Sequence, residues 1–336
     1  MSVLADFALP FLRCLDPEKA HNLTLASLKM GLGPKAFADE DGRLVTRLWG
    51  LTFLNPVGLS AGFDKNAEVC DAMLDTGLGF VEVGSVTPKA QEGNPKPRIF
   101  RLPKDGGVIN RLGFNNKGME VAARNLAHRK SRGIVGVNIG KNKATENAAD
   151  DYALAAEKLT PFADYLVINV SSPNTPGLRA LQDKAELARL VEATLIARNK
   201  AIDEAKFEKE YPPLLVKIAP DLNDDDLDDI AALALEMNID GLIVSNTTIS
   251  RPDSLKHKDV AGEQGGLSGK PLFELSTRIL SDVYQRVDGK IPLIGVGGIA
   301  SGRDAYQKIR AGASLVQLYS ALVYQGPSLV GSIKRD

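Results

Sequence analysis

The sequence predicts an α/β protein built on a closed (β/α)8 barrel, the TIM barrel, with an N-terminal helical extension. Two observations predict this fold class: eight short, β-branched apolar runs recur along the chain, and most are followed by a helical pattern. Alternation of near-continuous apolar strands with helices is typical of a parallel sheet. A doubly wound open sheet is disfavoured because no GxGxxG motif opens a helix after the first strand.

The apolar runs place the eight strands along most of the chain. A barrel of this type commonly occupies roughly 200 to 250 residues as one unit, so a chain of 336 residues leaves an extension to explain. Helical patterns are expected, among others, at residues 185–200, 225–237 and 303–311. The strands are expected at residues 57–60, 80–83, 135–139, 166–170, 214–218, 242–245, 293–296 and 315–318.

Composition excludes several classes of protein. A formal net charge of −1 offers no basic excess for a nucleic-acid partner. Cys14 and Cys70 form no CxxC pair or disulfide framework, and His21, His128 and His257 share no metal-ligand spacing, so we expect a reducing setting without a metal. No apolar run reaches the roughly 18 residues of a membrane span. The N-terminus lacks the basic region of a secretory signal, so we expect a protein on the cytosolic side.

Polar residues follow nearly every predicted strand. In α/β barrels the chemistry lies at the C-terminal ends of the strands, so these residues are the candidates for a site. In strand order they are residues 60–66, 84–87 and 138–142, then Asn169 and Ser172, Lys217, residues 245–248, Gly297 with Gly298, and Tyr319 with Ser320.

The segment INVSSPNTPG at residues 168–177 is the most informative of these ends. No histidine ends a strand, so a hydrolytic triad on Ser172 is disfavoured. A serine without such a partner can still relay a proton in a closed site where donors and cations stabilise the oxygen. The alternative is that Ser171 and Ser172 bond their own loop backbone. Nearby asparagines favour a ligand with carboxylate and imide groups.

Lys217 lies inside a buried strand, where an ammonium is costly unless it meets an anion or an electron-rich ring. Three roles remain open from the residues alone. The lysine could form a Schiff base, it could act as a fixed cation beside a cofactor, or it could take part in a structural salt bridge. Lys65 provides a second cation on a neighbouring loop, although alone it could simply be solvated.

Glycines after the seventh strand indicate a phosphate site. Gly295, Gly297 and Gly298 allow backbone N–H groups to approach a ligand, and Ser301 with Gly302 opens a helix there. The alternative is a tight turn without a ligand. Capping and the helix dipole, by contrast, explain the acidic run, which consists of Asp224, Asp225, Asp226, Asp228 and Asp229.

The N-terminal extension has the pattern of two short amphipathic helices within residues 1–31. Asp16 and Pro17 mark a helix start and Gly31 marks a stop. These helices could simply pad the core of the barrel.

Eight motifs together resemble one family. They are SAGFDKN at 60–66, PKPRIFRLP at 95–103, NRLGFNN at 110–116, NVSSPNTPG at 169–177, VKIAPD at 216–221, SNTT at 245–248, GGLSGKP at 265–271 and GVGGIASG at 295–302. In this order they resemble dihydroorotate dehydrogenase of class 2, the quinone-dependent and membrane-associated form. The resemblance covers nearly the whole chain.

The resemblance implies an FMN enzyme of pyrimidine (UMP) biosynthesis that oxidises (S)-dihydroorotate to orotate and passes the electrons to a quinone. Ser172 takes the family's base position, where the soluble class 1 enzymes have a cysteine. Class 1 and a Schiff-base aldolase on Lys217 are the alternatives. The implied substrate residues are Lys65, Asn110, Arg111, Leu112, Gly113, Phe114, Asn169, Asn174, Asn246 and Thr247. The implied FMN residues are Ala61, Gly62, Phe63, Asp64, Lys65, Ser85, Asn138, Asn169, Lys217, Ser245, Gly269, Gly298, Tyr319 and Ser320.

The resemblance also implies two parts of the chain. Residues 1–40 would form a membrane-associating lid with a quinone tunnel lined by His21, Arg101 and Tyr319, and residues 41–336 would form the FMN-binding barrel. Without the resemblance, His21 would be read as a helix-surface histidine. The implied location is the cytoplasmic face of the inner cell membrane, with peripheral attachment, and a monomer is favoured.

Overall fold

The computed structural model describes residues 8–36, 41–131, 133–205 and 210–336, and it contains a closed barrel of eight parallel strands. All eight predicted strands are confirmed, with bounds that differ by at most three residues. Around the barrel the order is β10 (Gly241–Val244), β12 (Leu293–Val296), β13 (Ala313–Leu318), β3 (Val57–Leu59), β4 (Phe80–Val86), β7 (Ile134–Ile139), β8 (Tyr165–Asn169) and β9 (Leu214–Ile218), which closes on β10.

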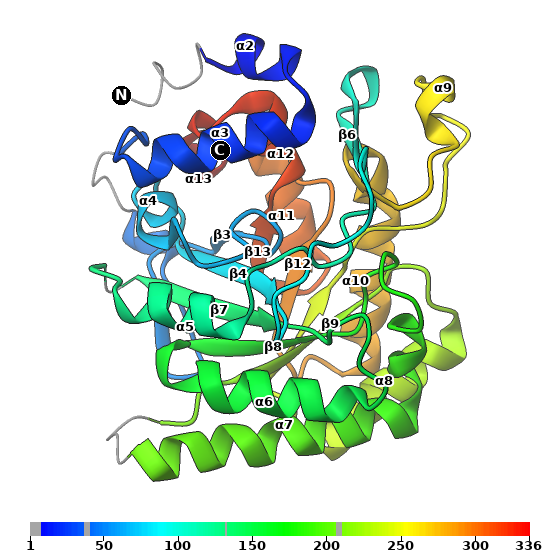
Figure 1. The fold of residues 1–336 in the computed structure, drawn as a ribbon. Helices are drawn as coiled ribbons and strands as arrows, with labels where there is room; N and C mark the ends of the chain where they lie inside the picture. The colour runs from blue at the N-terminus through cyan, green and yellow to red at the C-terminus, as the bar shows by residue number, and fades with distance from the viewer. Residues whose placement is uncertain (1–7, 37–40, 132, 206–209) are drawn as a thin grey trace.

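Helices cover the outside of the barrel, and Figure 1 shows α5, α6 and α7 stacked along one flank. The helices expected at residues 185–200, 225–237 and 303–311 are confirmed as α7, α8 and α11. The capping prediction for the acidic run is also confirmed, because Asn223 and Asp226 form a capping box at the start of α8. The outer helices are α4 (Cys70–Leu74), α5 (Met119–Ala127), α6 (Ala148–Leu159), α7 (Lys184–Ala205), α8 (Asp224–Glu236), α10 (Phe273–Arg286), α11 (Gly302–Arg310), α12 (Ser320–Gln325) and α13 (Ser328–Arg335).

The N-terminal end of the barrel is closed by a hairpin of β1 (Thr46–Leu48) and β2 (Leu51–Phe53). The Trp49 indole N–H donates to the carbonyl of Asp240 at 2.7 Å, which ties the hairpin to the start of β10. Above it, aromatic rings of Phe53, Phe80 and Tyr165 fill the lower barrel with aliphatic side chains from the other strands. This end is therefore packed, and any site must lie at the opposite end.

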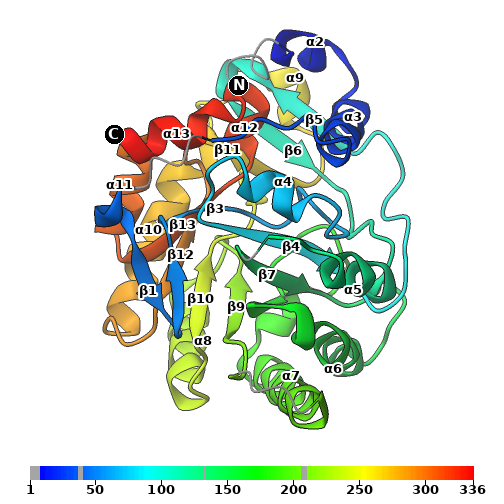
Figure 2. The same ribbon diagram turned by 90° about the vertical axis from the view of Figure 1, so that its left-hand side faces the viewer.

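At the C-terminal end a second sheet projects from the barrel. It consists of three antiparallel strands, β5 (Ile99–Leu102), β6 (Gly107–Asn110) and β11 (Gly266–Gly269), with the short helix α9 (Lys258–Ala261) beside it (Figure 2). These three strands were not predicted from the sequence. Short 3-10 turns at Gly42–Leu44, Pro103–Asp105, Thr160–Phe162, Arg179–Gln182 and Lys270–Leu272 complete the structure.

The N-terminal extension forms the two predicted helices, α2 (Leu9–Cys14) and α3 (Pro17–Lys29). The Asp16 carboxylate accepts the backbone N–H groups of the first turn of α3. An ion pair of 2.7 Å between Glu18 and Arg98 joins α3 to the projecting sheet. Figure 2 shows α2 and α3 on the same side of the barrel as β5 and β6, and Figure 1 shows both helices on the same side as β6. Residues 1–7 and the expected boundary at residue 40 lie outside the described residues.

No helix in the described ranges combines the length and apolar character needed to cross a membrane.

Packing inside the barrel predicts a strong effect of adding one methyl group at Gly136. A Cβ at this position would lie 2.0 Å from the Tyr165 ring, which is fully buried. We expect Gly136→Ala to lower the free energy of unfolding by about 1 to 3 kcal/mol or more, because overpacking forces the ring from its place. Gly262→Ala is the matched control, since no atom lies within 4 Å of its Cβ position. Equal denaturation midpoints for the two variants would contradict this description of the core.

Candidate active site

A cavity of about 850 Å³ lies at the C-terminal end of the barrel, between the strand ends, the projecting sheet and the helices α2 and α3. Most of the residues predicted for the site line it. They are His21, Ala61, Gly62, Phe63, Lys65, Ser85, Arg101, Asn110, Leu112, Gly113, Phe114, Asn169, Ser172, Asn174, Lys217, Ser245, Asn246, Thr247, Gly269, Gly298, Tyr319 and Ser320.

Asp64 is one of three predicted site residues that do not line the cavity. Its fully buried carboxylate accepts the backbone N–H groups of Glu68 at 2.8 Å and Val69 at 2.7 Å. Burial raises the pKa of Asp64, while these N–H donors act in the opposite direction. Asp64 therefore shapes the loop after β3 and presents its neighbours to the cavity.

Asn138 and Arg111 are the other two. The Asn138 amide lies behind the cavity wall, where it hydrogen-bonds to Ser85 and donates to a Glu82 oxygen at 2.9 Å. Arg111 turns outward to form an ion pair of 2.5 Å with Glu263. Asn138 was expected at a strand end and Arg111 came only from the family motif, and in both the side chain is directed to a protein neighbour.

The ammonium of Lys217 meets a buried carboxylate that the sequence analysis missed. Glu82 is fully buried on β4, and its Oε1 lies 3.5 Å from Nζ of Lys217. Nζ also donates to Oγ of Ser60 at 3.1 Å, and the Gln317 amide donates to Glu82 at 2.6 Å. The salt-bridge reading of Lys217 is therefore confirmed, although the lysine also faces the cavity. The sequence did contain a signal for this pair: Glu82 lies between Val81 and Val83 in an apolar strand, and a buried carboxylate needs a partner.

Ser172 follows β8 and is 7% exposed. Its Oγ accepts the backbone N–H of Asn174 at 3.3 Å, as the loop-bonding alternative expects, and the same hydroxyl lines the cavity. Ser171 points the other way, donating to Oδ1 of Asn169 at 2.7 Å and accepting from Nδ2 of Asn246 at 2.9 Å. The two serines thus divide the roles: one holds the strand ends together and the other faces the cavity.

Lys217 and Ser172 approach the cavity from adjacent strands. Asn169 at the end of β8 is in register with Lys217 on β9, so the loop that carries Ser172 begins level with the ammonium. Opposite it, Nδ2 of Asn174 donates to Oδ1 of Asn110 on the projecting sheet at 3.2 Å. A hydroxyl, a cation and several amides therefore surround one space.

Glycines form the part of the rim at β11 and β12. Gly298 has φ +79°, and a Cβ there would lie 2.5 Å from Cβ of Phe273. Gly269 has φ +84°, and its Cβ position is 2.3 Å from the carbonyl oxygen of Gly106. Only glycine adopts a positive φ without strain and leaves out the Cβ that would clash at these positions. As predicted, α11 starts at Gly302 with Ser301 as its cap.

A buried lysine that the sequence analysis missed lies under this glycine turn. Lys308 donates to Oγ of Ser276 at 2.6 Å, and Ser276 donates to the carbonyl of Gly297 at 3.1 Å. Burial lowers the pKa of Lys308 to about 7. The sequence predicted a helix at this position, but nothing in the local pattern indicated that the Lys308 side chain would be buried.

The other end of the cavity is apolar and is closed by the extension. His21 lies edge-on to the Phe63 ring at 5.2 Å between centroids, and Phe63 meets Tyr319 at 5.6 Å. The Arg101 guanidinium donates to the carbonyls of Arg13 and Leu15, each at 2.9 Å. His21 is thus a cavity residue, which corrects the helix-surface reading made from the residues alone.

Burial lowers the pKa of His21 to about 3, and the nearby charge of Lys65 acts in the same direction. The imidazole is therefore neutral at neutral pH. Burial also lowers the pKa of Lys65 itself to about 8, and its ammonium donates to the carbonyl of Gly62 at 2.5 Å. The charges of Glu18 and Asp64 act in the opposite direction and favour the charged form of Lys65.

This fold and this site define a (β/α)8-barrel enzyme whose reactive groups lie at the C-terminal ends of the strands. Residues 43–336 match the family model described as dihydroorotate dehydrogenase. The chain belongs to the dihydroorotate dehydrogenase family.

Similar proteins extend over almost the whole chain. Dihydroorotate dehydrogenase (quinone) of Rhodospirillum rubrum is 56% identical over 98% of this chain and 88% of its own length. The protein of the same name in Azorhizobium caulinodans is 56% identical over 97% of this chain and 92% of its own length. A crystal structure of DHODH from Eimeria tenella in complex with ferulenol has a TM-score of 0.90 at 46% identity, covering 95% of this chain and 90% of that one.

The Glu82–Lys217 pair predicts a large loss of stability when only one charge is removed. Glu82→Gln leaves the Lys217 ammonium buried without its carboxylate, so we expect the free energy of unfolding to fall by about 3 to 5 kcal/mol. The control is Glu236→Gln, which breaks a surface ion pair of 3.3 Å with Lys184 and should cost less than about 1 kcal/mol. Denaturant titration measures both. A similar loss of unfolding free energy in the two variants would show that the buried pair contributes no more to stability than the surface pair.

The lowered pKa of His21 predicts a loss of stability in acid. The unfolded chain binds a proton near pH 6.5 and the folded one near pH 3, so stability is complete above 6.5 and falls as the pH drops toward 3. At pH 5 the loss is at most about 2 kcal/mol. We expect His21→Gln to lose less thermal stability than the wild type between pH 8 and pH 5. His128→Gln, at an exposed position, should follow the wild type. A His21→Gln curve parallel to wild type would contradict burial of the neutral ring.

Proposed function

We propose that this protein oxidises (S)-dihydroorotate to orotate and passes the electrons to a quinone, as a step of pyrimidine biosynthesis. One observation carries the proposal beyond family membership. Ser172 and Lys217 line the same cavity from adjacent strands, β8 and β9. A hydroxyl that can take a proton from a carbon acid thus lies near a cation that can stabilise negative charge on an electron acceptor.

The cavity suits FMN as the cofactor. Three features support the fit: the Lys217 ammonium faces the cavity, the glycine rim permits close backbone approach, and Oε1 of the cavity residue Gln317 has no hydrogen-bond partner among the described residues. When bound, FMN would accept the hydride from C6 of dihydroorotate and give the electrons to the quinone. The residues that would hold it are Ala61, Gly62, Phe63, Lys65, Ser85, Asn169, Lys217, Ser245, Gly269, Gly298, Tyr319 and Ser320, with Asp64 and Asn138 supporting them from behind.

Ser172 would remove the proton from C5 of the substrate while its own hydroxyl proton passes to solvent water. The backbone N–H of Asn174 donates to its Oγ at 3.3 Å, which would stabilise the negative charge that develops on the oxygen. Amides suit the carboxylate and imide groups of the substrate because each offers a donor and an acceptor. The substrate residues would be Lys65, Asn110, Leu112, Gly113, Phe114, Asn169, Asn174, Asn246 and Thr247, while Arg111 would act through its backbone.

The apolar end of the cavity would admit the quinone, past His21, Arg101 and Tyr319. The helical extension would rest on the membrane surface, because it exposes several large apolar side chains. These are Phe11, Leu23, Met30 and Leu32, which are 63%, 44%, 67% and 69% exposed. We propose that the protein attaches peripherally to the cytoplasmic face of the inner cell membrane. We also propose that it is a monomer and has no nucleic-acid partner.

Both alternative activities have weaker support. A Schiff-base aldolase needs a neutral amine, whereas the Lys217 ammonium is paired with the Glu82 carboxylate at 3.5 Å. A class 1 enzyme would have cysteine where this chain has Ser172. Of the two cysteines, Cys14 lies on α2 and Cys70 starts α4, and neither lines the cavity.

The proposed function predicts a half-reaction that can be seen directly. Purified protein should be yellow, and anaerobic dihydroorotate should bleach its visible absorbance. A short-chain quinone added afterwards should restore the colour. A coloured protein that dihydroorotate does not bleach would exclude this function.

The role of Ser172 predicts a selective loss in Ser172→Ala. The variant should keep its flavin and its reoxidation by quinone, because the hydroxyl acts only on the substrate. Its reduction by dihydroorotate at neutral pH should be slower by about 10² to 10⁴, the usual value of a general base. Stopped-flow absorbance measures both steps. Ser172→Cys, which carries the class 1 residue, should retain part of the rate. Wild-type reduction by the alanine variant would mean that another group takes the proton.

A further inference from the structure

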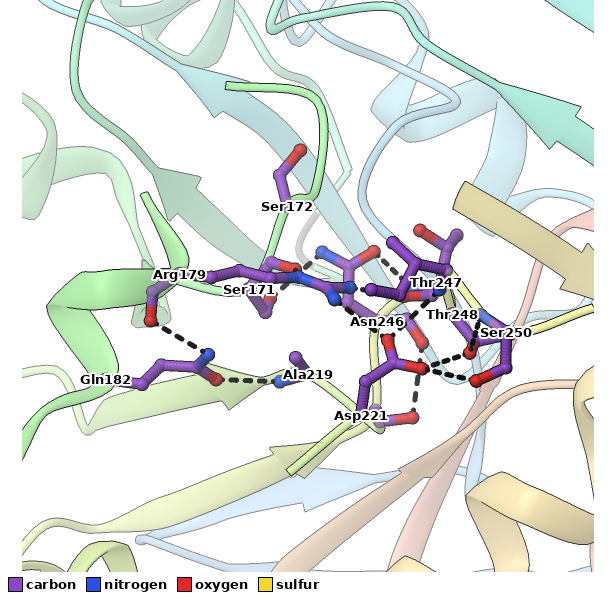
Figure 3. A network of polar contacts seen from close by, with 12 residues as sticks. Ser171, Ser172, Arg179, Gln182, Ala219, Asp221, Asn246, Thr247, Thr248 and Ser250 are labelled. Carbon is purple, nitrogen blue, oxygen red and sulfur yellow. Dashed lines mark hydrogen bonds and ion pairs between the residues drawn. The ribbon is translucent and has the colours of Figure 1, made fainter. Parts of the chain in front are cut away.

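Arg179 occupies an unusual position behind the loop that carries Ser172. It opens the 3-10 turn Arg179–Gln182, and its guanidinium makes three contacts with three different loops (Figure 3). Nε donates to the carbonyl of Ser171 at 3.0 Å, one terminal nitrogen donates to the carbonyl of Thr247 at 2.8 Å, and the other pairs with Asp221 at 2.8 Å. Arg179 itself does not line the cavity.

Asp221 extends this connection to the loop after β10. It lies after β9, and one carboxylate oxygen accepts the hydroxyl of Thr248 and, at 3.2 Å, that of Ser250. The other accepts the backbone N–H of Ile249 at 3.1 Å. The Arg179 and Asp221 side chains are 21% and 11% exposed. Three consecutive loops, after β8, β9 and β10, are therefore joined by one arginine–carboxylate pair.

The two carbonyls that Arg179 holds are next to residues of the proposed site. Ser171 immediately precedes Ser172, and Thr247 immediately follows Asn246. Figure 3 shows the Ser172 side chain directed away from the network that fixes its backbone. A planar guanidinium holds its acceptors in a fixed geometry, unlike a flexible ammonium. A side chain that does not line the cavity therefore holds the backbone next to Ser172.

We propose that Arg179, anchored by Asp221, is a positioning residue that holds the Ser172 hydroxyl against the substrate. The inference rests on the proposed function. A displacement of about 1 Å at a reacting group can cost roughly 100-fold in rate, so release of the Ser171 carbonyl should slow proton removal. Within the described residues, the polar contacts of Arg179 are with the loops after β8, β9 and β10 and not with the glycine rim or with α2 and α3. Flavin binding and quinone reduction should therefore not depend on Arg179.

The test separates the two half-reactions of the holoenzyme. In Arg179→Gln, anaerobic reduction by dihydroorotate should slow by roughly 10- to 100-fold, and deuterium at C5 should slow it further than it does in wild type. Flavin content and reoxidation by a short-chain quinone should stay at the wild-type level. Arg179→Lys should recover only part of the reduction rate, because one ammonium cannot reach all three acceptors in the same plane.

Arg198 provides a matched control at the other end of the barrel. It donates to the carbonyl of Pro212 at 3.0 Å and lies 3.6 Å from Asp240, with 11% of its side chain exposed. Arg198→Gln therefore removes a similar arginine clamp from two loops far from the cavity. It should keep both half-reactions while it changes the melting temperature.

The outcomes are distinct. Selective slowing of reduction in Arg179→Gln, absent from Arg198→Gln, supports the proposal, whereas a wild-type rate or an equal slowing of both half-reactions overturns it. If Arg179→Gln does not fold, Asp221→Asn is used instead, because it keeps the guanidinium but removes the carboxylate that anchors it. Selective slowing of reduction in Asp221→Asn supports the proposal, and a wild-type rate or equal slowing of both half-reactions overturns it. Wild-type protein that dihydroorotate fails to reduce would instead overturn the proposed function.

Discussion

The buried pair of Glu82 and Lys217 is the constraint on which the site depends. A carboxylate and an ammonium inside a barrel are tolerated only if each satisfies the other and further polar groups complete their hydrogen bonds. Asn138 on β7, Gln317 on β13 and Ser60 directly after β3 complete the set. The barrel interior therefore has two layers. Aromatic rings fill the N-terminal half, and a polar network under the cavity holds one ammonium at its surface.

The same division continues above the network. The wall formed by β8, β9 and β10 carries amides and hydroxyls, the wall at β11 and β12 carries glycines, and the helices α2 and α3 close the cavity with apolar side chains. Under the proposed function, the polar wall would pair with the small acid, the glycine wall would allow close backbone approach to the cofactor, and the apolar end would admit the quinone. Some of the backbone at the cavity is held from behind, as the Arg179–Asp221 pair holds the carbonyl of Ser171 next to Ser172.

The strands and the N-terminal helices could be read from the sequence because each has a local cause. Near-continuous apolar runs such as that at β8 are compatible with a strand buried on both faces, and Asp16 followed by Pro17 starts a helix wherever it lies. The projecting sheet could not be read, because β5 and β6 are short and interrupted by proline, charge and glycine. β6 pairs with β11, which lies about half the chain away, so the sheet depends on a tertiary contact.

The candidate site divides in the same way. The sequence alone determined which residues end the strands, and so placed Ser172, Lys217 and the asparagines at one end of the barrel, because parallel strands share a direction. Only the tertiary structure decided where the side chains point: Asp64 inward to its own loop, Arg111 outward, and Glu82 onto Lys217. The physical reason is that strand order follows local apolar periodicity, whereas the partner of a polar side chain depends on which strands and loops the closed barrel brings within hydrogen-bond distance.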